Sequence, residues 1–446
     1  MLYFSKKDFL FRLLSATNLI RCFEHGYGVE ERVHGLGVHA CFALFFNCSS
    51  VSALVLKRTT PMVTMLTAFT DEVDEAEFAV QAILEQLDLP TRQLRYAAGL
   101  LFCSADFIET GVAKAVCEAL PFDVIGCTSL ANAAPGGAGM TVLSLSVLTS
   151  DTVRFSAVMS EPLTFGLDAT IRSAFAKARS GEPEQPALVL AFPPLQMEIG
   201  SEAIAEALFT VAGDIPVFGQ IGCDHTPELN KTATLFNGRA ETTSLPLLFL
   251  YGDVTPRFFL KIISDDKIQK QKAIITASED SVLREVNGMP LMRYMEMLGV
   301  SKNNGIENIG VVPFIVKPPD GASPVARAIY TITDEGYAVC AGKMPEGATL
   351  TVGRLDRDDV LKTAGDTTTQ AVQAGRPDCV LIFSCMSRNM ALGADYLAEA
   401  EVVRAAMGGT CPYLLSYAGG EICPDVNDRG ERSNRFHNFT FIACTL

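Results

Sequence analysis

The first regular pattern along the chain is a helical one at residues 71 to 89. Apolar residues recur there every three to four positions and form one stripe, made of Val73, Ala76, Val80, Ile83, Leu84 and Leu87. Acidic residues fill the first turn, where they interact favourably with the helix dipole. This spacing predicts an amphipathic helix that buries one face.

One order of elements then occurs three times. Each copy has an apolar strand, an amphipathic helix, a second short strand, a glycine-bearing loop and a closing strand. The first strands are YAAGLLF, ALVLAF and CVLIFSC, the second are FDVIG, IPVFG and CPYLLSY, and the closing ones are MTVLSLSVL, LPLLFLYG and FHNFTFIACTL. Strands alternating with helices are typical of α/β proteins. We therefore predict an α/β fold of mixed β-sheets with crossover helices, in which this unit is repeated across two related modules.

The segment between the second and third copies has a different pattern. Residues 306 to 353 hold the short strands VARAIYTI, YAVCAG and ATLTVG, separated by PPDG, DEG and PEG turns. A β-rich region is predicted there.

The loops after the second strands occupy matching positions in the three copies. They read GCTSLANAAPGG, GCDHTP and GGEICP. Ligands of α/β sheets gather at the carboxyl ends of the strands, beside such loops. A position shared by three copies favours an architectural and binding role over a catalytic group that only one copy contains.

Net charge and cysteine content narrow the classes of partner and metal site that are expected. The chain has 446 residues and a formal net charge of -15, which argues against nucleic acid because phosphate binding needs clustered Lys and Arg. Its 13 Cys form no CxxC pair and sit mostly in apolar runs, as expected of reduced, buried thiols in the cytoplasm. Paired-ligand spacing for a structural zinc ion is absent.

The first 61 residues differ from the rest. They hold seven Lys and Arg against four Asp and Glu. Residues 35–56 are apolar enough to suggest a membrane anchor, although His39 and Asn47 interrupt the run. The other interpretation is that translation begins at Met62 or Met65 and that 1–61 is upstream sequence. No membrane partner is expected unless 35–56 is a real anchor.

Several motifs together resemble the FIST family. DVIGCTS matches its N-terminal signature, while EVNGMPLMRYMEMLG, LIFSCMSR, GGEICP and FHNFT match its C-terminal module in order. The resemblance implies a FIST N-terminal-like domain at 65–260 and a FIST C-terminal-like domain at 261–446, after an anomalous extension at 1–61.

What the resemblance implies for function is a stand-alone sensory protein of signal transduction that is not an enzyme. It would bind a small ligand such as an amino acid, need no cofactor and act on a separate signalling protein. Two alternatives stay open: a haem-binding nitric oxide sensor using His225 or His437, and a cysteine-dependent hydrolase or transferase using Cys385 with His437 as its base.

The best preserved motifs supply the main candidate ligand contacts. Arg388 is expected to clamp a carboxylate bidentately, with Cys385 lining the pocket; otherwise Arg388 pairs with Glu399 or Glu401. Glu421 is expected to accept hydrogen bonds from a ligand ammonium; otherwise it caps local N–H groups. Gly420, with Gly419, is expected to serve the turn through a positive φ.

The remaining candidates come from the equivalent loops and the closing motif. They are Gly126, Cys127, Thr128, Asp224, Tyr417, His437 and Asn438. The first loop departs from the family pattern, because Ser129–Asn132 stands where a Gly-Glu pair is expected. In the third copy Leu415 replaces an expected glycine. For Asp224 the competing interpretation is an Asx cap in a solvated turn, and for Asn438 it is a turn residue.

Overall fold

The computed structural model describes residues 62–446, apart from 93, 227, 301–309, 376, 410 and 428–429. The predictions for 1–61, including the anchor at 35–56, lie outside the described residues. Within the described part of the chain, no helix is both long and apolar enough to cross a membrane.

Three six-stranded sheets form the frame, and all three have the same order. The first contains β1 (Thr64–Thr70), β6 (Leu143–Ser150), β2 (Tyr96–Cys103), β3 (Val124–Thr128), β10 (Thr234–Phe236) and β11 (Arg239–Glu241). The second contains β7 (Arg154–Met159), β12 (Pro246–Tyr251), β8 (Leu188–Ala191), β9 (Val217–Ile221), β24 (Gly420–Val426) and β25 (Arg432–His437). The third contains β13 (Arg257–Lys261), β26 (Phe441–Thr445), β22 (Val380–Cys385), β23 (Tyr413–Ala418), β4 (Asn132–Ala134) and β5 (Gly137–Gly139).

The predicted strand–helix–strand–loop–strand unit is present in each sheet. In every copy the first and second strands pair in parallel, and the closing strand pairs antiparallel with the first. The crossover helices are α5 (Asp106–Glu109) and α6 (Val112–Glu118), α8 (Ser201–Ala212), and α12 (Met386–Leu392) with α13 (Ala398–Met407). The α/β fold with mixed sheets is thus confirmed.

Each copy also begins one strand and one helix earlier than predicted. β1, β7 and β13 lead to α4 (Ala76–Leu87), α7 (Leu167–Ala178) and α11 (Arg357–Gln373). The predicted helix at 71–89 corresponds to α4. It starts later because Glu72 accepts hydrogen bonds from the backbone N–H groups of Asp74 and Glu75 and holds a turn before the helix.

The loops after the second strands are exchanged between copies. The hairpin β4–β5 follows β3 but pairs with β23; β10–β11 follows β9 but pairs with β3; β24–β25 follows β23 but pairs with β9. The exchange is cyclic, so every sheet contains one hairpin from another copy.

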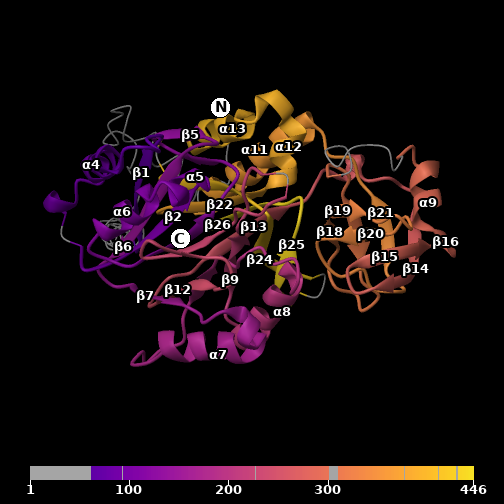
Figure 1. The fold of residues 1–446 in the computed structure, drawn as a ribbon, viewed down its shortest axis with the longest axis horizontal. Coiled ribbons are helices and arrows are strands. Elements are labelled where there is room, and N and C mark those ends of the chain that lie inside the picture. Colours follow the sequence, from indigo (N-terminus) through magenta and orange to yellow (C-terminus); the bar gives the residue numbers. More distant parts are fainter. Residues whose placement is uncertain are drawn as a thin grey trace, which may run out of the picture. The chain divides into compact units, whose positions relative to one another are not determined.

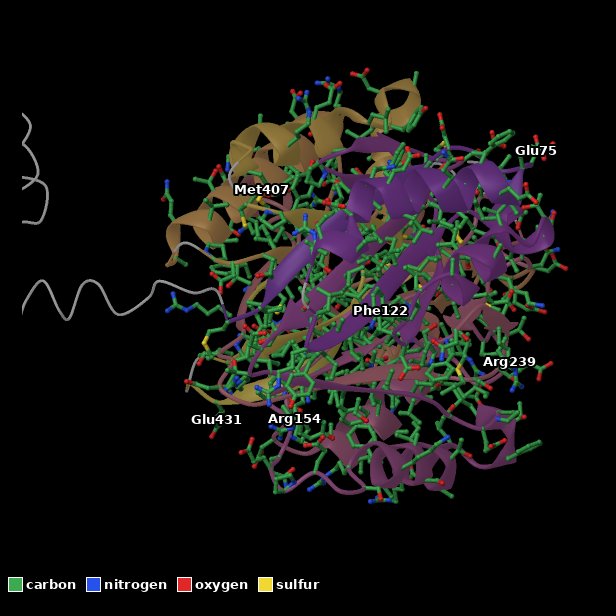
Figure 2. The ribbon with its side chains drawn as sticks, turned by 90° about the vertical axis from the view of Figure 1, so that its left-hand side faces the viewer. Glu75, Phe122, Arg154, Arg239, Met407 and Glu431 are labelled. Atoms are coloured by element: carbon green, nitrogen blue, oxygen red, sulfur yellow. The ribbon has the colours of Figure 1, made fainter. Side chains whose placement is uncertain are left out.

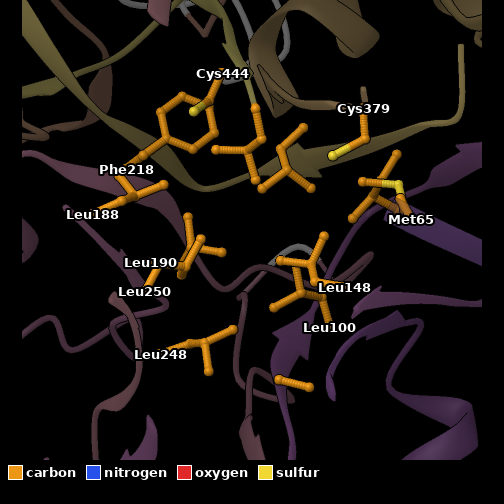
Figure 3. Close-up of a cluster of buried hydrophobic side chains, with 14 of the residues drawn as sticks. Met65, Leu100, Leu148, Leu188, Leu190, Phe218, Leu248, Leu250, Cys379 and Cys444 are labelled. Carbon is orange, nitrogen blue, oxygen red and sulfur yellow. The ribbon is translucent and has the colours of Figure 1, made fainter. Parts of the chain in front are cut away.

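Apolar inner faces of the three sheets meet in one core. Phe102, Phe192 and Phe383 come from matching positions and contact one another, with ring centroids 5.0–6.0 Å apart. Figure 3 shows side chains of this core from all three sheets, including Leu100, Leu190 and Cys444. The outer faces pack against helices: α4 and α6 on the first sheet, α7 and α8 on the second, α11 and α13 on the third. Strands covered on both sides read as continuous apolar runs, as they do in the sequence.

Many charged side chains lie at the periphery of these layers. Figure 2 shows Glu75, Arg239 and Glu431 at the outer edge of the ribbon, and all three are exposed.

A fourth sheet is inserted between β13 and α11. Its strands are β14 (Ala273–Glu279), β15 (Val282–Val286), β16 (Met289–Pro290), β17 (Phe314–Lys317), β18 (Val325–Arg327), β19 (Ile329–Ile332), β20 (Ala338–Cys340) and β21 (Thr349–Val352), with α9 (Leu291–Met297). They form a cluster of their own with a separate apolar core (Figure 1). The β-rich region predicted at 306–353 is confirmed and extends back to Ala273. We call residues 273–352 the inserted β-domain.

Candidate functional site

Strand register identifies the equivalents of Glu421. Glu421 pairs with Gln220 on β9, Thr234 pairs with Cys127 on β3, and Asn132 pairs with Ser416 on β23. All three hairpin positions are fully or almost fully buried. The fold therefore builds one polar position three times, and only the third copy places an acid there.

The partners on the second strands meet between the sheets. The Gln220 Nε2 donates to Ser416 Oγ at 2.9 Å and to Cys127 Sγ at 3.3 Å. This contact joins all three copies through side chains at matching positions. It leaves the Gln220 Oε1 without a partner.

Only one of the two oxygens of the Glu421 carboxyl has a hydrogen-bond partner by distance and angle. Its Oε2 accepts from the Thr440 backbone N–H at 3.2 Å and from Thr440 Oγ1 at 2.6 Å, while Oε1 has no partner. Burial raises the pKa of Glu421 to about 8, against the opposing effects of the Thr440 hydrogen bonds, a hydrogen bond with the Cys385 thiol and the charge of Arg388. The carboxyl is thus mainly neutral at pH 7.

Other unpaired acceptors lie beside it. Gln220, Glu421 and His437 are neighbours across three strands and share one face of the sheet. His437 Nε2 lies 3.2 Å from the Cys423 carbonyl, and its Nδ1 has no partner. Burial lowers the pKa of His437 to about 3, so the ring is neutral. The next residue, Asn438, also has an unpaired Oδ1, but its side chain lies on the opposite face of the sheet, against Gly420. Buried polar atoms are normally paired, so the unpaired atoms of Gln220, Glu421 and His437 on one face suit a polar ligand.

A pocket lies between the first turn of α8 and the inserted β-domain. It has a volume of about 70 Å³ and is lined by the first turn of α8, by Tyr330 and by the segment Val339–Lys343. The Tyr330 hydroxyl is buried in this lining beside the Ser201 side chain. Burial raises the pKa of Tyr330, with the Cys385 thiol and the Glu421 carboxyl acting on it as neighbours. Tyr330 therefore lines the pocket and lies within electrostatic range of Glu421.

Arg388 is held by the protein itself. It is fully buried, and its Nε and Nη2 donate to Glu399 Oε1 at 3.0 and 2.6 Å. Nη2 also donates to the Val360 carbonyl and to Thr363 Oγ1, and Nη1 donates to the Ile262 carbonyl. This is the competing interpretation, a pairing with Glu399 and not with Glu401. Ligand clamping by Arg388 stays a prediction, and we leave Arg388 out of the site proposed below.

Cys385 lies at the end of β22, against Glu421. Burial and then the Glu421 charge raise the pKa of the Cys385 thiol. A thiol is a weak nucleophile unless its pKa is lowered, and burial keeps His437 neutral while its Nε2 lies on the Cys423 carbonyl. This geometry provides no activated thiolate–imidazole pair, and a pocket-lining role for Cys385 stays a prediction.

The prediction of a positive φ at Gly419 and Gly420 is wrong. Neither is among the positive-φ residues of the described chain, and Gly420 opens β24. Glycine is needed for close packing instead. A Cβ on Gly420 would lie 2.6 Å from the Phe436 ring, and one on Gly419 would lie 2.9 Å from the Gly222 carbonyl oxygen.

Two of the other predicted ligand contacts, Asp224 and Thr128, form hydrogen bonds with the protein's own backbone. Asp224 accepts from the Thr226 N–H at 2.6 Å and from the Lys231 N–H at 2.7 Å, so it caps its loop as the competing interpretation expected. Thr128 bonds the backbone of Ala233. Of the remaining predicted residues, Gly126 and Cys127 are buried in β3 and Tyr417 is buried in β23. His225 is exposed on its loop.

Four residues of this region were missed from sequence: Gln220, Arg327, Tyr330 and Thr440. Arg327 carried a signal, because it shares its alternation phase in VARAIYTI with the apolar Val325 and Ile329. A charged residue at such an inward position indicates a buried partner. The other three have no local signal. In the described part of the chain, no group of three or more His, Cys, Asp or Glu could hold a metal ion.

Comparisons with known proteins agree with the motifs. The FIST N domain matches residues 97–289, and the FIST C domain matches residues 290–424. No curated protein matches the chain. Among solved structures, the chain is similar to a cyanuric acid hydrolase from A. caulinodans, with 9% identity and a TM-score of 0.33, over 86% of this chain and 99% of that one.

Proposed function

Because the chain belongs to the FIST family, whose domains are small-ligand sensory domains of signal transduction, we propose that it senses a small metabolite bearing an ammonium group, with an α-amino acid as the leading case. The supporting observation is the group of three buried side chains with unpaired polar atoms, Gln220, Glu421 and His437, on one face of the sheet. An ammonium supplies three donors and a positive charge.

Glu421 would carry the recognition. Its Oε1 would accept from the ammonium while Thr440 continues to hold Oε2. A cation beside the carboxyl favours its charged form, so binding would be coupled to loss of the Glu421 proton. Cys385 would line the site. The liganded protein would act on a separate signalling protein, in the cytoplasm.

The test is binding at pH 8, measured by calorimetry and thermal shift on the full chain. The twenty amino acids and simple alkylamines serve as probes. We expect at least one amino acid to bind, and Glu421→Gln to weaken it about 100-fold, which is the upper value for a hydrogen bond to a charged group. Glu77→Gln on exposed α4 is the matched control and should bind as the wild type does.

Two results would contradict the proposal. One is the absence of binding by any amino acid or amine at millimolar concentration. The other is an unchanged dissociation constant in a folded Glu421→Gln variant.

A further inference from the structure

A second pocket lies between the β4–β5 hairpin and one face of α13, and none of the residues proposed above to bind an ammonium lines it. Its walls are hairpin residues 133–138, four residues at or next to α13, and Tyr413 at the start of β23 (Figure 1). Its volume is about 280 Å³. A water molecule needs about 10–15 Å³ of such space, so the pocket has room for one small organic molecule. We call it the α13 pocket.

The other two hairpins close the corresponding space beside their helices. In the β10–β11 turn, a Cβ on Gly238 would lie 3.0 Å from the Lys114 Cα of α6. In β25, Phe436 belongs to the same apolar cluster as Ile204 and Leu208 of α8. Residues 133–138 read AAPGGA, so the β4–β5 hairpin offers α13 only methyl groups, a proline ring and backbone. The space beside α13 therefore stays open.

The wall of the α13 pocket contains a buried hydroxyl that the protein does not bond. Tyr413 is 3% exposed, and its hydroxyl forms no hydrogen bond with any described residue. The matching first residues of β3 and β9 are Val124 and Val217, so the repeated fold does not need a hydroxyl at this position. Since buried polar groups are normally paired, the Tyr413 hydroxyl points to a partner that the protein itself does not supply.

α13 adds a cation beside this hydroxyl. Leu397, Ala400, Glu401 and Arg404 line the pocket together, because residues three and four apart share one face of a helix. Arg404 is exposed and forms no ion pair with any described residue. Burial raises the pKa of Tyr413 and the Arg404 charge opposes the rise, so the two groups are neighbours. A guanidinium and a phenol hydroxyl thus both have donors available for one anion, next to an apolar wall.

We propose that the α13 pocket is a second ligand site, which binds a small monocarboxylate with an apolar body, such as phenylacetate. Arg404 and the Tyr413 hydroxyl donate to the carboxylate, and the alanines of the hairpin with Leu397 contact the body. The exposed Glu401 also lines the pocket, so the site has no net charge and repels a second anionic group. This inference does not depend on Glu421 and goes beyond the proposed function.

Calorimetry on the full chain at pH 7 compares three acids with their neutral amides. The probes are benzoate, phenylacetate and 3-methylbutanoate, against benzamide, phenylacetamide and 3-methylbutanamide. We expect at least one acid to bind and its amide to bind about tenfold more weakly, as for the loss of a hydrogen bond to a charged group. Tyr413→Phe should weaken the acid about tenfold. It should leave the melting temperature unchanged, because the hydroxyl has no partner in the protein to lose.

The two charges of α13 should act in opposite directions. Arg404→Gln removes the cation and should weaken the acid about tenfold. Glu401→Gln removes the repelling carboxylate and should strengthen the acid up to about fivefold, the range of an exposed charge pair. Arg172→Gln, on the exposed side of α7, is the matched control and should bind the acid as the wild type does.

A variant that fills the pocket locates the ligand independently of Tyr413. Ala138 is exposed and lines the pocket, so Ala138→Leu should block it without disturbing the core and should abolish binding of phenylacetate. Absence of binding by all three acids at millimolar concentration overturns the inference. Acid binding that neither Tyr413→Phe nor Ala138→Leu weakens places the ligand elsewhere and also overturns it. An affinity that Arg404→Gln does not lower shows that the pocket does not recognise the carboxylate.

Discussion

The first and third copies have the same backbone arrangement. They differ in the side chains at the hairpin that follows the second strand. In both, a residue at the end of the first strand bonds a matching carbonyl: the Ser104 N–H donates to the Val142 carbonyl, and the Cys385 N–H donates to the Thr440 carbonyl. The hairpin residue beside this bond is Asn132 in the first copy and Glu421 in the third. Asn132 donates to Ser129 Oγ at 2.7 Å and leaves only its Oδ1 unpaired.

This difference shows that the repeated backbone determines where a buried polar side chain lies. The residues of each copy then determine whether that side chain is an acid and which groups bond it. The third copy replaces Val142 with Thr440, whose hydroxyl and N–H both bond Glu421. It also receives Tyr330 from the inserted β-domain, which no other copy has. An acid, a partner that orients it and a neighbouring pocket therefore coincide only once.

The largest expected effect concerns the buried pair that belongs to the third copy alone. Arg388→Ala leaves Glu399 buried without its cation, and breaking a buried pair in this way costs about 3–5 kcal/mol of unfolding free energy. Urea denaturation measures the loss. Lys362→Ala, which breaks the exposed pair with Asp366, is the control and should cost less than about 1 kcal/mol. Equal costs would mean that Arg388 is not a structural residue and would reopen its role as a ligand clamp.

The second effect tests the charge of Glu421 in the ligand complex. Its pKa is about 8, so below pH 8 binding an ammonium must first remove a proton. Affinity should rise about tenfold per pH unit from pH 6 to pH 8, and level off above that. Nearby, Cys385 stays protonated because its pKa is raised, and His437 stays neutral because its pKa is about 3. Calorimetry across this range measures the slope.

Glu421→Gln is the control for that slope and should remove it. Without ligand, the raised pKa also predicts that wild-type stability falls relative to Glu421→Gln as pH rises from about 4.5 to 8, because only the unfolded state ionises there. A wild-type affinity that does not change with pH would show that Glu421 does not carry the charge in the complex.

The sequence predicted the repeated unit because strands buried on both faces leave apolar runs and because the loops follow them at matching points. Glu421 could be selected as a candidate site residue because it lies in one of these loops. The exchange of hairpins could not be predicted, since the pairing of β24 with β9 joins residues about 200 positions apart. Tyr330 was also out of reach, because it comes from an insertion that has no counterpart in the other copies. Gly420 was recognised, but its cause is the packing of Phe436 and not its own φ.

A smaller effect is expected from placing an acid in the first copy. Asn132→Asp keeps the shape but removes the amide donor to Ser129 and adds a buried carboxyl without the Thr440 hydroxyl. We expect a loss of about 1–3 kcal/mol near neutral pH. Burial should raise the pKa of this Asp, so the loss should grow as pH rises above about 4, where the unfolded state ionises. Urea denaturation at pH 4.5 and pH 8 tests this, and a loss that is independent of pH would contradict the equivalence of Asn132 with Glu421.

The smallest effect compares glycines of two hairpins. Gly420→Ala puts a Cβ 2.6 Å from the Phe436 ring and 3.2 Å from Asn438 Nδ2, so β25 must shift. Overpacking of this kind costs about 1–3 kcal/mol. Gly136→Ala, in the hairpin of the first copy, meets its nearest atoms at 3.6 Å and has an ordinary φ, so it should cost less than about 0.5 kcal/mol. Because Phe436 and Asn438 flank His437, Gly420→Ala should also weaken amino-acid binding, whereas Gly136→Ala should not. If both variants bind and unfold alike, the close packing of β24 on β25 does not shape the site.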